Sequence, residues 1–319
     1  MNNPAPNNPS PNNPAPNDFI PDKADPNSPS AQWLTVPAPA KLNLMLHITG
    51  QRADGYHELQ TIFQFLEYGD QLSFQSRNDS ELTLSPEIVG VNFEDNLIIK
   101  AARSLQNHPN ASNKQCGANI RLEKILPMGG GLGGGSSDAA TTMLALNFIW
   151  KLDLSLEELA KLGIKLGADV PVFIKGQACW AEGIGEKITP LPDLAENWFL
   201  VACPNAHSNT KEIFSHKELT RDSEILNMRH ALEGQAANTV RNDCQLVASK
   251  LSPEIGKTLN LLNKFGSAKM TGTGACVFLS VTSENKATQV ASKLPAELDI
   301  FIAKGTNLSS AHKVLFGSV

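Results

Sequence analysis

The chain has 319 residues and a formal net charge of −5 at pH 7, with 27 Lys and Arg side chains against 32 Asp and Glu. This length allows two domains with a large core, and the acidic balance, without any Lys/Arg-rich stretch, argues against a nucleic-acid-binding surface. No apolar run approaches the ~18 residues of a membrane span, and the five cysteines include no Cys-x-x-Cys pair, so neither a disulfide framework nor a zinc site is predicted.

The N-terminal segment 1–32 repeats Asn-Asn-Pro units with a period of five, and nine of the chain's 20 prolines lie in the first 30 residues. With almost no apolar side chains to bury, this tail is predicted to be disordered with polyproline character. It lacks the apolar core of a signal peptide. We expect a dispensable extension rather than a docking segment.

A strand is predicted around residues 42–48. Its apolar residues alternate and form one face: Leu42, Leu44, Leu46 and Ile48. Because side chains two residues apart on a strand share a face, Lys41 and Asn43 are expected to point together to the opposite face.

The most distinctive segment is Pro127-Met-Gly-Gly-Gly-Leu-Gly-Gly-Gly-Ser-Ser-Asp-Ala-Ala-Thr141, in which six of the seven residues from Gly129 to Gly135 are glycine. Glycine within a fold costs conformational entropy, so this run indicates a backbone that turns tightly and presses its N–H groups against a ligand.

The flanks of this glycine loop support the same interpretation. Ahead of it, Ile120, Leu122 and Ile125 fall near a period of two, as in a half-buried strand. Behind it a helix is predicted to begin at Ser136, Ser137 or Asp138, which are favoured N-cap residues. Unpaired N–H groups and the helix dipole make a helix N-terminus an anion site, so the loop is predicted to bind phosphate.

Three common phosphate-binding patterns do not fit. Gly129, Gly131 and Gly134 satisfy the dinucleotide spacing, but the acid about 20 residues later, Asp153, lies between two helical segments and not at the end of a strand. The single Gly-Lys-Thr has Leu251 where a P-loop needs its first glycine. No His-Arg-Asp or Asp-Phe-Gly triplet marks a protein kinase. The loop therefore belongs to another class.

A helix with a capping box is predicted from Ser155-Leu-Glu-Glu158 to about Leu166, with Gly167 ending it. Asp169 follows directly, ahead of Val170-Pro-Val-Phe173. From its position alone, Asp169 is typical of a helix-end or turn aspartate.

The glycine segment resembles the ATP-binding motif of the galactokinase, homoserine kinase, mevalonate kinase and phosphomevalonate kinase (GHMP) superfamily. Two other segments resemble the branch that phosphorylates 4-diphosphocytidyl-2-C-methyl-D-erythritol. These are Pro39-Ala-Lys-Leu-Asn43 followed by Gly50-Gln-Arg-Ala-Asp-Gly-Tyr-His57, and Met270-Thr-Gly-Thr-Gly-Ala-Cys-Val-Phe278. The likeness extends in order and spacing over roughly residues 35–315, and the N-terminal extension departs from it.

This resemblance implies an α/β (α+β) two-domain GHMP-kinase fold. The ATP-binding domain is expected at 33–181 together with 297–319, and a smaller α+β substrate-binding domain at 182–296. The active site would lie in the cleft between them.

The resemblance also implies ATP-dependent phosphorylation of the substrate's 2-hydroxyl, a step of non-mevalonate isoprenoid precursor biosynthesis. Asp169 in Gly167-Ala-Asp-Val-Pro171 matches the family's catalytic Asp and is expected to act as base. Lys41 would keep that carboxylate ionised. The residues expected to bind ATP are Pro127, Met128, Gly129, Gly130, Gly131, Leu132, Gly133, Gly134, Gly135, Ser136 and Ser137.

For the substrate, the pair Tyr56-His57 occupies the place where the family receives a cytosine ring. A tyrosine face stacks on a base and a histidine bonds its edge, and Phe214 matches the second stacking wall. Asn43 and Thr210 are expected to bond the methylerythritol hydroxyls or phosphates.

The turn containing Gly272 and Gly274 is expected to bring its backbone close to the substrate phosphates or the glycine loop; a purely structural turn is the alternative. Mg²⁺ is expected with ATP, but no acidic pair identifies its ligands; the Ser137 hydroxyl is a candidate. We expect a cytoplasmic enzyme with a small-molecule substrate and no nucleic-acid or membrane partner, and the sequence leaves the oligomeric state open.

Three alternatives stay open. Another GHMP-type kinase would act on homoserine or a mevalonate derivative, but such substrates give the Tyr56-His57 pair no base to bind. A nucleotide-binding sensor would have no use for Lys41 and Asp169. A dinucleotide oxidoreductase would need the missing acid on a second strand.

Overall fold

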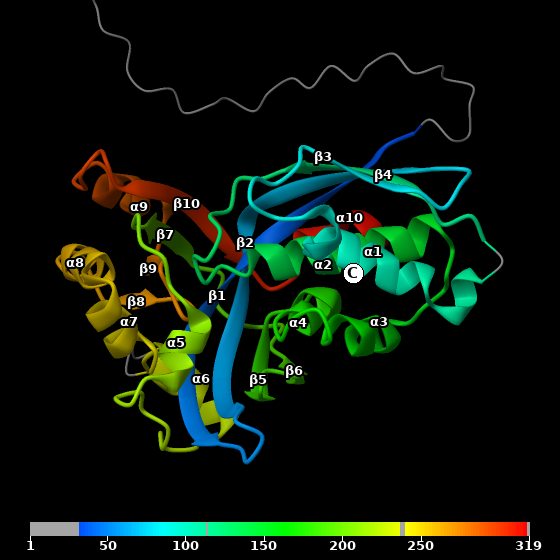
Figure 1. Ribbon diagram of the computed structural model, residues 1–319. Helices are drawn as coiled ribbons and strands as arrows, with labels where there is room; N and C mark the ends of the chain where they lie inside the picture. Colours follow the sequence, from blue (N-terminus) through cyan, green and yellow to red (C-terminus); the bar gives the residue numbers. More distant parts are fainter. Residues whose placement is uncertain (1–31, 113, 237–239, 318–319) are drawn as a thin grey trace, which may run out of the picture.

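The computed structural model describes residues 32–112, 114–236 and 240–317. The predicted disordered tail therefore lies outside the described residues, apart from Gln32. Two long antiparallel strands, β1 (Leu34–Gln51) and β2 (His57–Ser76), form a hairpin that runs through the middle of the molecule (Figure 1).

Ten strands of the described chain join in one branched sheet, in the order β3-β4-β2-β10-β7-β9-β8, with β1 and β5 also paired to β2 and β6 paired to β5. The further strands are β3 (Leu82–Ser85), β4 (Ala118–Glu123), β5 (Cys179–Gly183), β6 (Lys187–Pro190), β7 (Trp198–Cys203), β8 (Ala268–Met270), β9 (Val277–Val281) and β10 (Asp299–Thr306). The β3–β4 pair is parallel, and the other pairs between these strands are antiparallel.

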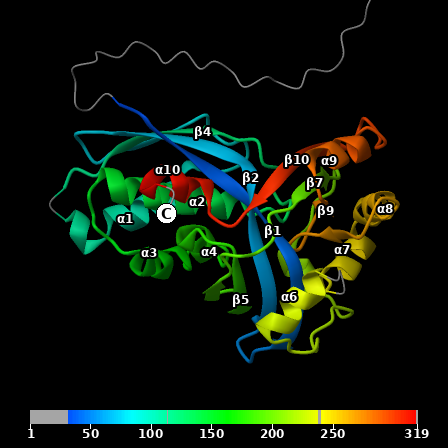
Figure 2. The same ribbon diagram turned by 180° about the vertical axis from the view of Figure 1, so that it is seen from behind.

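The helices form two groups on either side of the β1–β2 hairpin in both views (Figures 1 and 2). One group comprises α1 (Leu97–Gln106), α2 (Gly134–Ile149), α3 (Leu156–Gly163), α4 (Val170–Lys175) and α10 (Ser310–Phe316). The other comprises α5 (Thr210–Ser215), α6 (Met228–Ala236), α7 (Gln245–Leu251), α8 (Pro253–Leu262) and α9 (Glu284–Ala291). Short 3₁₀ turns lie at Phe93–Asp95 and Pro109–Ala111. Within the described ranges, every helix is too short or too polar to cross a bilayer.

Three apolar clusters form the core. One packs the first helix group against β2 and β4, and another packs α7, α8 and α9 against β7, β8 and β9. The third contains Leu42 of β1, Phe199 of β7 and Ala303 of β10, so it joins the two halves. The predicted domain boundary at residues 181–182 falls within β5, and the division into two domains stays a prediction.

The predicted strand at residues 42–48 is part of β1, but the prediction that its apolar residues form a single face is wrong. Register shifts between Asn43 and Met45 and between Pro39 and Lys41 interrupt the alternation. Leu42 and Leu44 consequently pack in the central cluster, whereas Leu46 and Ile48 pack in the α7–α8 cluster.

Two other elements end at different residues than predicted. The strand ahead of the glycine loop ends at Glu123, so Ile125 lies outside β4 and is exposed. The capping box at Ser155 and Glu158 is present, but α3 ends at Gly163 and the chain continues in turns to Gly167.

Candidate active site

A cleft of about 740 Å³ lies between the hairpin, the glycine loop, the start of α2 and the turn 271–274. Every residue proposed above for a catalytic or binding role lines it, except Ser137. These residues come from segments far apart in the sequence, and the fold gathers them in one place.

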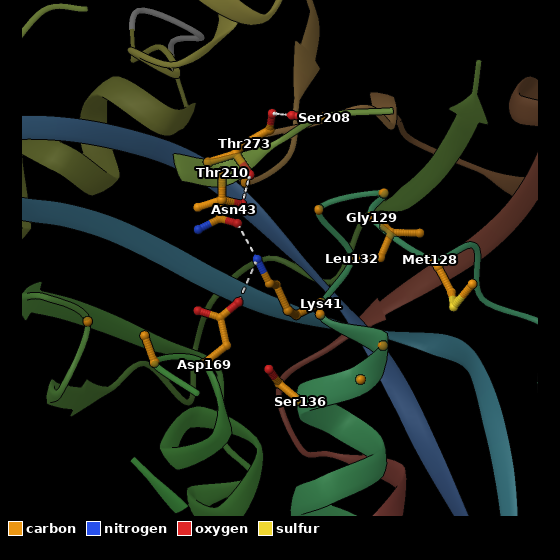
Figure 3. A pocket seen from close by; sticks show the side chains of 18 of the residues that line it. Lys41, Asn43, Met128, Gly129, Leu132, Ser136, Asp169, Ser208, Thr210 and Thr273 are labelled. Atoms are coloured by element: carbon orange, nitrogen blue, oxygen red, sulfur yellow. Dashed lines mark hydrogen bonds and ion pairs between the residues drawn. The ribbon is translucent and has the colours of Figure 1, made fainter. Parts of the chain in front are cut away.

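Lys41 and Asp169 meet in this cleft. Lys41 Nζ lies 3.2 Å from Asp169 Oδ2 and donates to Asn43 Oδ1 at 2.6 Å (Figure 3). The Lys41 side chain is 3% exposed, while that of Asp169 is 34% exposed and open to the cleft. A buried ammonium needs such partners, and Phe63 adds its ring face 5.1 Å from Nζ.

Local structure explains why these two side chains are aimed at each other. Lys41 lies on β1 beside the glycine loop, and its backbone N–H donates to Leu132 O at 2.9 Å. Asp169 is the N-cap residue of α4, a helix that the sequence did not predict. The prediction that Lys41 and Asn43 share a strand face is confirmed by their hydrogen bond.

The glycine loop turns tightly, as its composition predicts, and three of its glycines have a left-handed backbone. Gly129, Gly131 and Gly133 have φ of 72°, 76° and 76°, a region that L-residues rarely adopt. A Cβ on Gly131 would lie 2.2 Å from Thr271 O, and one on Gly133 would lie 2.8 Å from the Phe173 ring. Both positions therefore need glycine for space as well as for conformation.

The start of the following helix differs from the prediction. α2 begins at Gly134, its N-cap is Gly133, and no side chain caps it. The first amide of the helical ladder is that of Ser137, which donates to Gly133 O. The amides of Gly134, Gly135 and Ser136 therefore precede the ladder and are available to an anion.

Ser137, which was predicted to bind ATP and named as a candidate Mg²⁺ ligand, does not line the cleft. Its side chain is fully buried and its hydroxyl donates to Pro39 O at 2.7 Å. Its neighbour Ser136 lines the cleft instead (Figure 3). The difference follows from the helix start, because beginning at Gly134 turns residue 137 toward β1.

The turn at residues 271–276 is bonded to the glycine loop, one of the two expected arrangements. The amides of Ala275 and Cys276 donate to Gly129 O and Gly130 O at 3.2 and 3.0 Å. Gly272 and Gly274 both have positive φ and line the cleft. Asn242, which sequence analysis missed, supports the turn by donating to Met270 O and Gly272 O.

Asn43 and Thr210 lie in the cleft in different settings. Asn43 is 3% exposed, accepts from Lys41 and donates to Thr61 Oγ1 at 2.9 Å, so it positions the lysine. Thr210 is exposed, and its hydroxyl lies 2.9 Å from that of Thr273 (Figure 3).

The aromatic residues lie at the hairpin end of the cleft. Tyr56 is 60% exposed, whereas His57 is 8% exposed. The rings of His57 and Phe214 are in contact, with centroids 5.0 Å apart and planes tilted by 31°. The fold thus brings residue 214 of α5 against the start of β2, as the predicted base site requires.

Comparison with known proteins identifies the family. The GHMP kinases N terminal domain matches residues 96–177, and the GHMP kinases C terminal domain matches residues 218–300. The 4-diphosphocytidyl-2-C-methyl-D-erythritol kinase of Pseudomonas paraeruginosa (strain DSM 24068 / PA7) is 54% identical over 282 residues, covering 88% of this chain and 97% of that relative. The chain belongs to the 4-diphosphocytidyl-2-C-methyl-D-erythritol kinase family.

Two further proteins agree. The kinase of the same name from Hahella chejuensis (strain KCTC 2396) is 52% identical and covers 86% of this chain and 94% of that relative. A crystal structure of 4-(cytidine 5'-diphospho)-2C-methyl-D-erythritol kinase matches with a TM-score of 0.74 at 30% identity, covering 86% of this chain and 99% of that one. The predicted family, GHMP-kinase fold and enzyme class, a phosphotransferase with an alcohol acceptor, are confirmed.

In this family member, a partly buried charge cluster beside the glycine loop was not predicted from the sequence. Lys124 Nζ donates to Asp70 at 2.6 Å and to Asp138 at 2.8 Å. Asp70, which is fully buried, also accepts from the amides of Ile125 and Leu126. The cluster fixes the segment that enters the loop. Its signal in the sequence was weak, because the three charges are far apart along the chain.

A pH-dependent stability is expected from this cluster. Burial raises the pKa of Asp138 to about 7; the Lys124 ammonium opposes this shift and Asp70 adds to it. An unfolded Asp titrates near 4. The contribution of Asp138 to the free energy of unfolding is therefore complete below about pH 4 and is lost as the pH rises through about 7. In thermal unfolding, we expect the Asp138→Asn variant to gain stability relative to the wild type between pH 5 and pH 8.

The matched control is Asp193→Asn, at an exposed position away from the cleft. Its difference from the wild type should not change with pH. An Asp138→Asn difference that is constant over the same range would show that Asp138 is already ionised at pH 5.

An apolar wall of the cleft was also missed. It is formed by Ile88, Val91 and Leu97, and it adjoins Met128, which was predicted to bind ATP. Beside them, Asn96 caps α1 by accepting from the Ile98 amide at 2.9 Å. The loop 86–96 carries no periodic pattern, so its position against the glycine loop was not predictable from the sequence.

Proposed function

We propose that this kinase transfers the γ-phosphoryl group of ATP to the 2-hydroxyl of 4-diphosphocytidyl-2-C-methyl-D-erythritol, a step of non-mevalonate isoprenoid precursor biosynthesis. The observation that carries the proposal is the Lys41–Asp169 pair in a cleft that also contains the glycine loop and the aromatic residues.

The glycine loop binds the phosphates. The amides of Gly134, Gly135 and Ser136 lie at the N-terminus of a 16-residue helix, whose dipole favours negative charge. The apolar wall with Ile88 and Leu97, which lines the same cleft, gives the adenine ring a surface.

Asp169 acts as the base. It accepts the proton of the 2-hydroxyl, the hydroxyl oxygen bonds to the γ-phosphorus, and the bond from that phosphorus to the β–γ bridging oxygen breaks to release ADP. Lys41 keeps Asp169 ionised through the 3.2 Å contact. Asn43 holds Lys41 in place, since its side-chain oxygen accepts from the ammonium.

Mg²⁺ fits this site as an ion that arrives with the nucleotide. In the described residues no group of three His, Cys, Asp or Glu side chains is placed to hold a metal, and Mg²⁺ in ATP sites takes few protein ligands beside phosphates. The oxygen ligands among the residues that line the cleft include the Ser136 hydroxyl and the carboxylates of Asp138 and Asp169. The ion neutralises charge on the transferred phosphoryl group.

The cytosine ring binds at Tyr56, His57 and Phe214. We expect Tyr56→Ala combined with Phe214→Ala to raise KM for the cytidyl substrate by at least about tenfold, since base stacking contributes ~1–3 kcal/mol per base. KM for ATP should stay the same, as measured by coupled ADP release. An equal rise in both KM values would contradict the stacking role.

An ADP-release assay that offers the cytidyl substrate, homoserine, mevalonate and galactose side by side tests the substrate. We expect turnover with the cytidyl compound alone. A preference for homoserine or mevalonate would support the alternative of another GHMP-type kinase, and the three aromatic residues argue against it because those substrates carry no base.

A further inference from the structure

Arg221 connects the two sides of the proposed base site. Its Nε donates to His57 Nε2 at 3.1 Å. Its Nη2 donates to Phe214 O and to His216 O, both at 2.9 Å, and its Nη1 donates to Leu219 O at 3.1 Å. One guanidinium thus holds the histidine ring and the segment that carries the phenylalanine. Arg221 does not itself line the cleft.

The bond to His57 decides where the ring carries its proton. An arginine N–H can only donate, so His57 Nε2 must be the acceptor and bears no hydrogen. The neutral ring then has its proton on Nδ1. Burial lowers the pKa of His57, and the Arg221 charge lowers it further, so the ring is neutral at pH 7.

The second ring nitrogen remains free for a ligand. Nδ1 makes no hydrogen bond to any described residue. Both ring nitrogens of His47 and of His312 also lack a partner but are fully buried, whereas Nδ1 of His57 is accessible. His57 lines the cleft. It therefore presents one N–H donor to whatever binds beside Phe214.

We infer that Arg221 is a positioning residue that fixes His57 as an Nδ1–H donor, and that this selects a pyrimidine whose N3 is an acceptor. Cytosine has an unprotonated N3 that can accept a hydrogen bond from His57 Nδ1–H. Uracil carries a hydrogen on N3, so two N–H donors would face each other and no hydrogen bond would form. The inference rests on the proposed function, and it names the residue that sets base specificity.

The first test is the ring itself. In ¹⁵N spectra of the wild type at pH 7, with His57 assigned by comparison with His57→Gln, we expect Nδ1 to show the shift of a protonated nitrogen and Nε2 that of an unprotonated one. A protonated Nε2 with an unprotonated Nδ1 would overturn the inference, and the kinetics of the variants would not change that conclusion.

The second test is kinetic and uses the cytidyl substrate and its uridyl analogue. In Arg221→Met, the ring is free to move its proton to Nε2, and Nδ1 then accepts from uracil N3–H. We expect the ratio of kcat/KM for the cytidyl over the uridyl compound to fall at least about tenfold, with KM for ATP unchanged. Arg221→Lys keeps a donor for Nε2 but cannot reach all three carbonyls, so it should retain the ratio although KM rises.

Arg229→Met is the matched control, because Arg229 is 86% exposed on α6 and pairs only with Glu233 among the described residues. It should match the wild type. If Arg221→Met raises KM for both pyrimidine compounds equally, Arg221 merely holds the loop and the inference fails. If the wild type does not phosphorylate the cytidyl compound, the proposed function fails instead, and the ¹⁵N pattern still reports on the ring.

Discussion

Asp169→Asn is expected to lower kcat by at least about a hundredfold, because general-base assistance contributes ~10²–10⁴ in rate. The amide keeps the size of the carboxylate but cannot take the hydroxyl proton. ATP should still bind, because the glycine loop is unchanged. Lys41→Ala should lower kcat by at least about a hundredfold as well, since Asp169 then loses its 3.2 Å ammonium partner. Steady-state kinetics and nucleotide titration measure both effects.

Asp193→Asn serves as the matched control for Asp169→Asn, because it makes the same chemical change at an exposed site outside the cleft. It should turn over at the wild-type rate. Thermal unfolding of each variant separates a loss of chemistry from a loss of fold, which matters for Lys41 because its side chain is buried. Near-wild-type turnover in a folded Asp169→Asn or Lys41→Ala enzyme would remove that residue from the mechanism.

Gly131→Ala is expected to lower kcat/KM for ATP by about a hundredfold, since a displacement of about 1 Å at a site of phosphoryl transfer is enough for such a loss. The new Cβ would lie 2.2 Å from Thr271 O, on a residue whose φ is 76°. The backbone cannot yield without moving the turn that is bonded to the loop, so the phosphate cradle must shift. Kinetics at varied ATP concentration measures the effect.

Gly256→Ala is the matched control for this change. Gly256 lies in α8, a methyl group added there would meet nothing closer than 3.5 Å, and the substitution suits a helix. We expect activity like that of the wild type and equal or higher stability. If Gly131→Ala retains the wild-type kcat/KM for ATP, the tight approach of the loop to Thr271 is not required for nucleotide binding.

The sequence predicted which residues meet in the cleft better than it predicted the details of the backbone. Lys41 and Asp169 could be paired because a motif marks each of them. The run of glycines likewise predicted a tightly turning loop. Ser137 could not be placed, because its direction depends on a helix that starts at Gly134 rather than at a side-chain cap. The role of Asn43 as a substrate ligand stays a prediction. The sequence placed Asn43 beside Lys41, but its hydrogen bond to Thr61 depends on how β1 pairs with β2 and could not be predicted.

Contacts between distant segments were beyond sequence reasoning. Arg221 looks like an ordinary surface residue until α5 and the hairpin meet, and its four hydrogen bonds then appear together. The Asp70–Lys124–Asp138 cluster likewise joins β2, the loop after β4 and α2, and no local pattern marks a buried charge.

A structure of Asp169→Asn bound to ATP, Mg²⁺ and the cytidyl substrate tests the central claim most directly. We predict that the triphosphate lies on the amides at the start of α2, that the 2-hydroxyl lies within hydrogen-bond distance of residue 169, and that Lys41 Nζ stays beside them. A γ-phosphate bound elsewhere in the cleft, or a 2-hydroxyl facing away from residue 169, would contradict it.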